Sequence, residues 1–187
     1  MPRIKLDDTD KPGIAGLLAY RPEAAGPLLD LTEVLLRDEN TLSRGERELV
    51  VALVSERNGC RWTRRIHGSF AAAQLAGGAR LVDEVCVDFD HAPIPEKLRA
   101  LLRLAEAVAL SGKAVTDEVV DRARDLGATD REIHDVVLIA ATFSMFNRYV
   151  TGLAAAVPDD PEVYRQLTER LLATSYPVLG GVRAAVE

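Results

Sequence analysis

Residues 42–70, LSRGERELVVALVSERNGCRWTRRIHGSF, carry the sharpest helix signals of this chain. Ser43 and Glu46 have the Ser-x-x-Glu spacing of a capping box, which starts a helix, and an apolar run follows them. Asn58 and Gly59 form a signal that ends this helix, and a second helical pattern begins directly after them. Because the connection is so short, the two helices are predicted to pack antiparallel as a hairpin.

The rest of the 187 residues indicates more helices, and we expect an all-α helical bundle that forms a single domain over residues 1–187. Aromatic residues make up only 5% of the chain, and the β-branched residues are scattered among helix-forming residues. The segment 81–94 is predicted to be a loop or a short helix. The segment from Asp130 is the most apolar, and we expect it to be the core helix. Predicted helices span about residues 28–38, 44–58, 60–76, 95–110, 117–126, 130–157 and 161–173, between a loose lead-in that ends near Pro27 and a C-terminal arm from Thr174.

Composition argues against several function classes. Lys and Arg total 23 against 29 Asp and Glu, so the net charge of −6 disfavours a nucleic-acid partner. The two cysteines, Cys60 and Cys86, are too few for a disulfide scaffold or a thiolate zinc site, which favours a reducing, cytoplasmic location. No apolar run is long enough to span a membrane, and no phosphate-binding glycine loop, dinucleotide motif or histidine metal pair occurs. We therefore expect no cofactor and no metal.

Four residues near the hairpin turn carry chemically useful groups. Cys60, Thr63 and His67 are three and four residues apart, so they share one face of the second helix. Glu48, on the first helix, is predicted to lie at about the height of His67, which makes a Glu–His contact plausible. A histidine held by a carboxylate can take a proton from a nearby thiol or hydroxyl. This is the arrangement of an activated nucleophile.

With these residues the chain resembles the family of AhpD-like alkylhydroperoxidases and carboxymuconolactone decarboxylases. That family commonly has a Glu, a Cys-x-x-Cys pair twelve residues later, and a His four residues after the second Cys. Here those places hold Glu48, Cys60, Thr63 and His67. The likeness extends from about Tyr20 to Leu153. It implies an AhpD-like helical bundle, a homo-oligomer and a small-molecule substrate.

Thr63 departs from the family pattern at the position of the second cysteine. In redox members, that cysteine is understood to attack the peroxide, Glu and His relay its proton, and the first cysteine closes the disulfide. A hydroxyl forms neither a sulfenic acid nor a disulfide, so the two-cysteine cycle cannot run here. The resemblance then implies a hydroperoxide-reducing activity that is diminished or depends on one cysteine.

Two other functions remain open from the sequence. Glu48 and His67 are also suited to acid–base chemistry of the carboxymuconolactone decarboxylase kind on a small carboxylated compound, with an arginine binding the carboxylate. Alternatively, the chain is a non-catalytic oligomeric binding protein that keeps the hairpin for structure.

The surroundings of the four residues allow a reactive and an inert interpretation. Four nearby arginines and a helix N-terminus would favour an accessible Cys60 thiolate, whereas a buried Cys60 would be inert. Cys86 is a possible but disfavoured partner for an oxidised Cys60. Trp62 is expected at a pocket or subunit wall, and His134 is expected to be structural. Asn147 and Arg148 are expected to brace the site or an interface.

Overall fold

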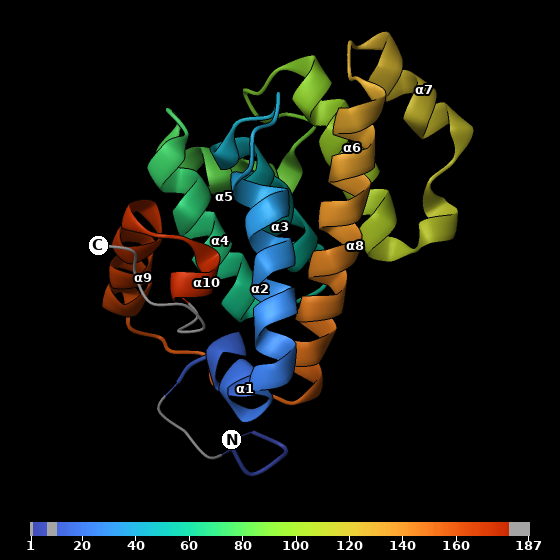
Figure 1. The fold of residues 1–187 in the computed structure, drawn as a ribbon. Helices are drawn as coiled ribbons and strands as arrows, with labels where there is room; N and C mark the ends of the chain where they lie inside the picture. The colour runs from blue at the N-terminus through green and yellow to red at the C-terminus, as the bar shows by residue number, and fades with distance from the viewer. Residues whose placement is uncertain (1, 7–10, 180–187) are drawn as a thin grey trace.

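The computed structural model describes residues 2–6 and 11–179, and within these ranges every regular element is a helix (Figure 1). The all-α prediction is therefore confirmed. The elements are α1 Ile14–Tyr20, α2 Pro22–Arg37, α3 Arg44–Arg57, α4 Arg61–Gln74, α5 Gly78–Asp88, α6 Glu96–Leu110, a 3-10 turn at Gly112–Ala114, α7 Asp117–Asp125, α8 Asp130–Gly152, α9 Pro161–Ala173 and α10 Tyr176–Leu179.

The predicted hairpin of α3 and α4 is the centre of the fold. The capping box is present, because the Ser43 hydroxyl accepts from the Glu46 N–H and the Glu46 carboxylate accepts from the Ser43 N–H. Gly59 has a φ of +65°, a left-handed conformation that glycine adopts without steric cost, so the chain reverses within three residues. The whole segment 47–55 of α3 is buried, since α4, α5, α6 and α8 pack around it.

Three boundaries differ from the sequence prediction. The prediction of a loose lead-in up to Pro27 is wrong. Residues 14–20 form α1, and α2 already begins at Pro22 and includes Pro27. Pro22 fits the first helical position because its missing N–H would have no partner inside the helix. The segment 81–94, predicted to be a loop or a short helix, contributes residues 81–88 to a short helix, α5, and agrees with the second alternative.

The other two differences concern the C-terminal half. The long helix α8 ends at Gly152 and not at Pro158, because Ala154 takes a left-handed φ of +49°. The helix α8 packs on α3 and α6 but leaves Leu138 and Met145 partly exposed, so the most buried helix is α3. The final helix is α10 and not α9. Residues 180–187 of the predicted arm lie outside the described residues.

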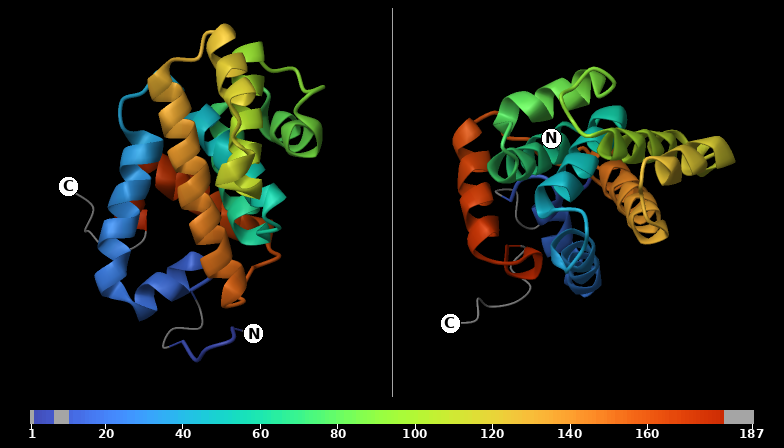
Figure 2. Two further views of the ribbon diagram at one scale, coloured as in Figure 1. Left: turned by 90° about the vertical axis from the view of Figure 1, so that its right-hand side faces the viewer. Right: turned by 90° about the horizontal axis from the view of Figure 1, so that it is seen from above.

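Peripheral helices lie on opposite sides of the hairpin, as both views show (Figures 1 and 2). On one side α9 packs on α4, and α10 bridges α9 and α2. On the other side α7 covers α6 and α8. Among the described residues, no helix combines the length and the apolar character needed to cross a membrane.

Candidate active site

The contact expected across the hairpin is a buried hydrogen bond between Glu48 and His67. His67 Nδ1 lies 2.7 Å from Glu48 Oε2, and the two residues are 7% and 0% exposed. Since the carboxylate oxygen accepts, Nδ1 donates, and the other ring nitrogen, Nε2, is the acceptor of a neutral ring. The edges of Phe70 and Phe143 contact the imidazole at centroid distances of 5.5 and 4.8 Å. The histidine is therefore held in one orientation in an apolar setting.

Cys60 and Thr63 lie at the start of α4, and their side chains touch. Cys60 occupies the N-cap position, and its Sγ lies 3.2 Å from Thr63 Oγ1. The thiol is only 1% exposed and Thr63 is 4% exposed. The expected alignment of Cys60, Thr63 and His67 is thus present, but the thiol is buried.

The arginines near Cys60 do not support the interpretation of an accessible thiolate. All four donate to carboxylates elsewhere: Arg57 to Glu106, Arg61 and Arg65 to Asp159, and Arg64 to Asp83. None of these hydrogen bonds reaches the Cys60 sulfur, and the carboxylate partners screen the positive charge near it.

A tyrosine that sequence reasoning missed completes the group. The Tyr176 hydroxyl donates to Glu48 Oε1 at 2.6 Å, and its ring stacks on His67 with centroids 6.1 Å apart. The two residues of the hydrogen bond are 128 positions apart in the chain. Only the aromatic nature of Tyr176 within the C-terminal arm hinted at a packing role.

A small cavity of about 140 Å³ opens beside this group. The ring of His67 and the side chain of Thr63 line it, whereas Glu48 and Cys60 do not. Trp62 forms part of its wall, as expected from the sequence. The other lining residues are mostly apolar: Pro12, Ile14, Ala15, Leu18, Leu29, Thr32, Ile66, Phe70, Phe143, Phe146, Leu167 and Tyr176. A ligand in this cavity would meet His67 and Thr63 before it met the thiol.

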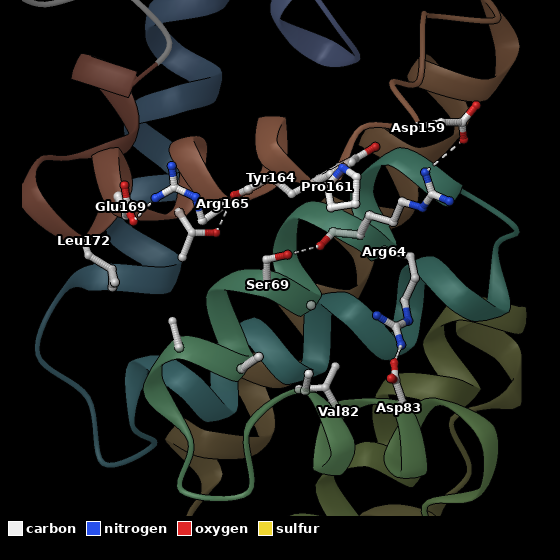
Figure 3. Close-up of a pocket in the computed structure, with 16 residues that line it drawn as sticks. Arg64, Ser69, Val82, Asp83, Asp159, Pro161, Tyr164, Arg165, Glu169 and Leu172 are labelled. Atoms are coloured by element: carbon white, nitrogen blue, oxygen red, sulfur yellow. Dashed lines mark hydrogen bonds and ion pairs between the residues drawn. The ribbon is translucent and has the colours of Figure 1, made fainter.

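A larger hollow of about 670 Å³ lies between α4, α5 and α9 (Figure 3). Its polar walls are ion pairs: Arg64 with Asp83 at 2.7 Å, and Arg165 with Glu169. Glu48, Cys60 and His67 do not line it. This hollow is distinct from the Glu48–His67 group, and its charged side chains are already engaged with one another.

The second cysteine, Cys86, is buried on α5, and both thiols are free. Burial is the main cause that raises the pKa of Cys86 to about 11. The thiol of Cys86 therefore stays protonated at neutral pH, which makes it a poor nucleophile.

The helix α8 braces the hairpin turn from its far side. The Ser55 hydroxyl donates to the Val51 carbonyl at 2.8 Å and lies 3.3 Å from Asn147 Oδ1, and the Ser55 carbonyl accepts the N–H of Cys60 at 2.9 Å. Asn58 also donates to the hydroxyl of Ser144 at 3.1 Å. The contact of Asn147 agrees with its expected bracing role, which stays a prediction, whereas Arg148 donates to a carbonyl of its own helix.

The exposed ring of His134 contacts the carboxylate of its neighbour Asp135 at 2.9 Å. His134 does not line the cavity beside Glu48 and His67. Among the described residues, no cluster of three or more His, Cys, Asp or Glu side chains is arranged to hold a metal ion.

Known proteins resemble this chain in structure. No protein-family model matches it, and no curated protein matches it in sequence. The AhpD core of an uncharacterized peroxidase-related protein from Ralstonia eutropha is 26% identical, with a TM-score of 0.71 over 80% of this chain and 78% of that chain.

Two further structures support the fold. An uncharacterized peroxidase-related protein from a Silicibacter species is 24% identical, with a TM-score of 0.72 over 79% of this chain and 77% of that chain. A protein of unknown function from Agrobacterium tumefaciens is 20% identical, with a TM-score of 0.69 over 80% of this chain and 100% of that chain. This chain therefore has the fold of the AhpD-like, peroxidase-related proteins, consistent with the family resemblance of its hairpin.

Proposed function

We propose that this protein reduces hydroperoxides through a single cysteine, Cys60, at a diminished rate. The observation that carries the proposal is the contact of Cys60 with Thr63, one turn before a histidine that Glu48 orients. The chain keeps the parts that move protons and one of the two thiols of the family pattern. It lacks the thiol that would stand in the Thr63 position.

The chemistry needs one nucleophile and one proton relay. The Cys60 sulfur attacks the terminal oxygen of the hydroperoxide, the S–O bond forms as the O–O bond breaks, and the products are a sulfenic acid and an alcohol. The sulfur loses two electrons and the peroxide bond gains them. The thiol proton passes through the Thr63 hydroxyl, its contact at 3.2 Å, to Nε2 of His67, which then delivers this proton to the departing alkoxide.

The cycle closes with an external thiol as reductant. One thiol converts the sulfenic acid to a mixed disulfide and releases water, and a second thiol releases the reduced cysteine. Cys86 is poorly suited to replace the external thiol within the chain, because burial raises its pKa to about 11.

The position of Thr63 explains the low rate that we propose. Thr63 lines the cavity, and Cys60 lies behind it with 1% of its surface exposed. The Thr63 side chain must therefore rotate before a peroxide in the cavity reaches the sulfur. The apolar walls and the volume of about 140 Å³ favour hydrogen peroxide or a small uncharged organic hydroperoxide.

Intact-mass measurement of the reduced protein, exposed to graded hydroperoxide, tests the proposal. We expect a gain of one oxygen atom in the wild type, retention of this gain in Cys86→Ser, and its loss in Cys60→Ser. A gain that persists in Cys60→Ser, or a wild type that stays unmodified, would contradict the proposal.

A non-redox acid–base enzyme is the second proposal, and one observation favours it. His67 and Thr63 face the cavity directly, so a ligand can exchange protons with His67 without any thiol. If the protein is an acid–base enzyme of this kind, the variant Cys60→Ser should turn over substrate as fast as the wild type. The arginine expected to bind a substrate carboxylate is not among the described residues that line this cavity, so an uncharged compound fits better.

A homo-oligomer is also proposed, and exposed apolar residues on α8 support it. Leu138 is 36% exposed and Met145 is 42% exposed. Light scattering after size-exclusion chromatography measures the mass directly. A mass equal to the 20.3 kDa of one chain would contradict an oligomer, and the non-catalytic binding role would then lose its main support.

A further inference from the structure

The C-terminal helix α10 brings a side chain into direct contact with the Glu48–His67 pair. Tyr176 is 5% exposed, and its hydroxyl lies 2.6 Å from Glu48 Oε1. Its ring stacks on His67 with an interplanar angle of 19°, and it forms part of the cavity wall. One residue thus touches the carboxylate, the imidazole and the cavity.

Glu48 makes two hydrogen bonds that use its two oxygens separately. Oε2 accepts from His67, and Oε1 accepts from Tyr176. The residue is fully buried, so these hydrogen bonds replace the water that the carboxylate loses on folding. With one oxygen fixed by the phenol, the carboxylate cannot rotate freely about its terminal bond.

The direction of the phenol hydrogen bond is set by its environment. Burial and the negative charge of Glu48 raise the pKa of Tyr176 well above its usual value of 10. The hydroxyl therefore keeps its proton at neutral pH and donates it to the carboxylate.

Three anchors hold this tyrosine in place. The N–H of Tyr176 donates to Glu33 at 2.8 Å, and Arg37 donates to the carbonyl of Thr174 at 3.1 Å. Both partners belong to α2. Arg170, on α9, donates to the carbonyl of Val178 at 3.3 Å. Contacts from two helices thus position the phenol.

We propose that Tyr176 is a positioning residue of this site: its hydroxyl orients the Glu48 carboxylate so that His67 donates through Nδ1 and keeps Nε2 as the acceptor for the cavity. The role rests on the proposed function in one respect only, namely that His67 moves protons there. The orientation itself is a property of the resting protein and does not require turnover.

The test is proton NMR of the His67 Nδ1–H group in Tyr176→Phe. This variant keeps the ring and removes only the hydroxyl. In the wild type we expect a downfield, slowly exchanging Nδ1–H signal. In Tyr176→Phe we expect the signal to move upfield or to disappear through faster exchange with water.

Tyr164→Phe is a matched control. Tyr164 is also buried, and its hydroxyl donates to the carbonyl of Pro158 at 2.7 Å, away from Glu48 and His67. We expect the Nδ1–H signal to be unchanged in this variant. A folded Tyr176→Phe with the wild-type signal would overturn the proposal, since a tyrosine that only packs would not move it.

If Tyr176→Phe does not fold, a second measurement on the wild-type sequence tests the same role. Incorporation of 3-fluorotyrosine makes the phenol a stronger donor, and Tyr176 is the only tyrosine among the described residues with a hydrogen bond to Glu48. We expect the His67 signal of the labelled wild type to shift. An unchanged signal would refute the role. Because neither experiment uses a hydroperoxide, failure of the proposed function would leave both results interpretable.

Discussion

Replacing Thr63 with cysteine is predicted to restore the two-thiol chemistry. In the native chain, Thr63 Oγ1 lies 3.2 Å from Cys60 Sγ. A disulfide is about 2.05 Å long, so a sulfur at the Oγ1 position would need to approach by roughly 1.2 Å. A side-chain rotation at the start of α4 can supply that movement. The introduced thiol would also face the cavity that His67 lines.

We expect Thr63→Cys to consume hydroperoxide roughly 100-fold faster than the wild type. The introduced thiol would face the cavity beside His67, whereas His67 reaches the buried Cys60 only through Thr63, and direct proton transfer by a positioned acid–base group commonly contributes about 10²–10⁴ in rate. The assay follows peroxide loss with an excess of dithiol, and intact mass follows the loss of two hydrogens on disulfide formation. Thr63→Ser, which keeps a hydroxyl, is the control and should match the wild type. Equal rates for Thr63→Cys and Thr63→Ser would refute the view that Thr63 alone interrupts the cycle.

Three further predictions concern stability and thiol reactivity. Burial opposes ionisation of Glu132, yet hydrogen bonds from Lys97 and the Thr129 N–H bring its pKa down to about 2, from 4.5. Its stabilisation of the fold is therefore present above about pH 4.5 and lost as the pH falls toward 2. Chemical denaturation should show Glu132→Gln less stable by about 3 kcal/mol at pH 7 and by much less at pH 2; an equal difference at both pH values would contradict this. At pH 8 only roughly 0.1% of Cys86 is thiolate given its pKa of about 11, so peptide mapping should find it nearly unalkylated in the native protein and fully alkylated after unfolding. Gly13→Ala should lower the free energy of unfolding by about 1–3 kcal/mol, because its Cβ would lie 2.1 Å from Trp62 Cε2; Gly127→Ala, also at positive φ but with open space around it, should cost less.

Local signals explain why the hairpin could be predicted. The capping box at Ser43 and the glycine after Asn58 depend on neighbouring residues alone, and the structure has both the capping box and the left-handed Gly59. The contact of Glu48 with His67 then follows from helix geometry, since an antiparallel pair with a short turn fixes which residues lie at equal height. The contact between Glu48 and His67 was therefore predictable from the sequence.

The sequence was less informative where distant segments decide the outcome. The sequence predicts a lead-in that ends near Pro27, yet Pro27 lies within α2, on an exposed side of the helix. The role of Tyr176 depends on how α9 and α10 fold back over α2 and α4, which no local pattern encodes. Burial of Cys60 has the same origin, because packing against the body and not the local charge pattern decides its exposure.

In the mechanism that we propose, Glu48 and His67 move protons for chemistry at Cys60. The most direct measurement is the second-order rate constant for oxidation of Cys60 by hydroperoxide in His67→Asn, compared with the wild type. Asparagine retains a group that can donate to Glu48 but cannot act as a base near neutral pH. His134→Asn, at an exposed histidine, is the control.

We predict that His67→Asn oxidises Cys60 at least about tenfold more slowly, while His134→Asn keeps the wild-type rate. If His67→Asn oxidised Cys60 as fast as the wild type, the buried pair would be a structural link between α3 and α4 and not a proton relay.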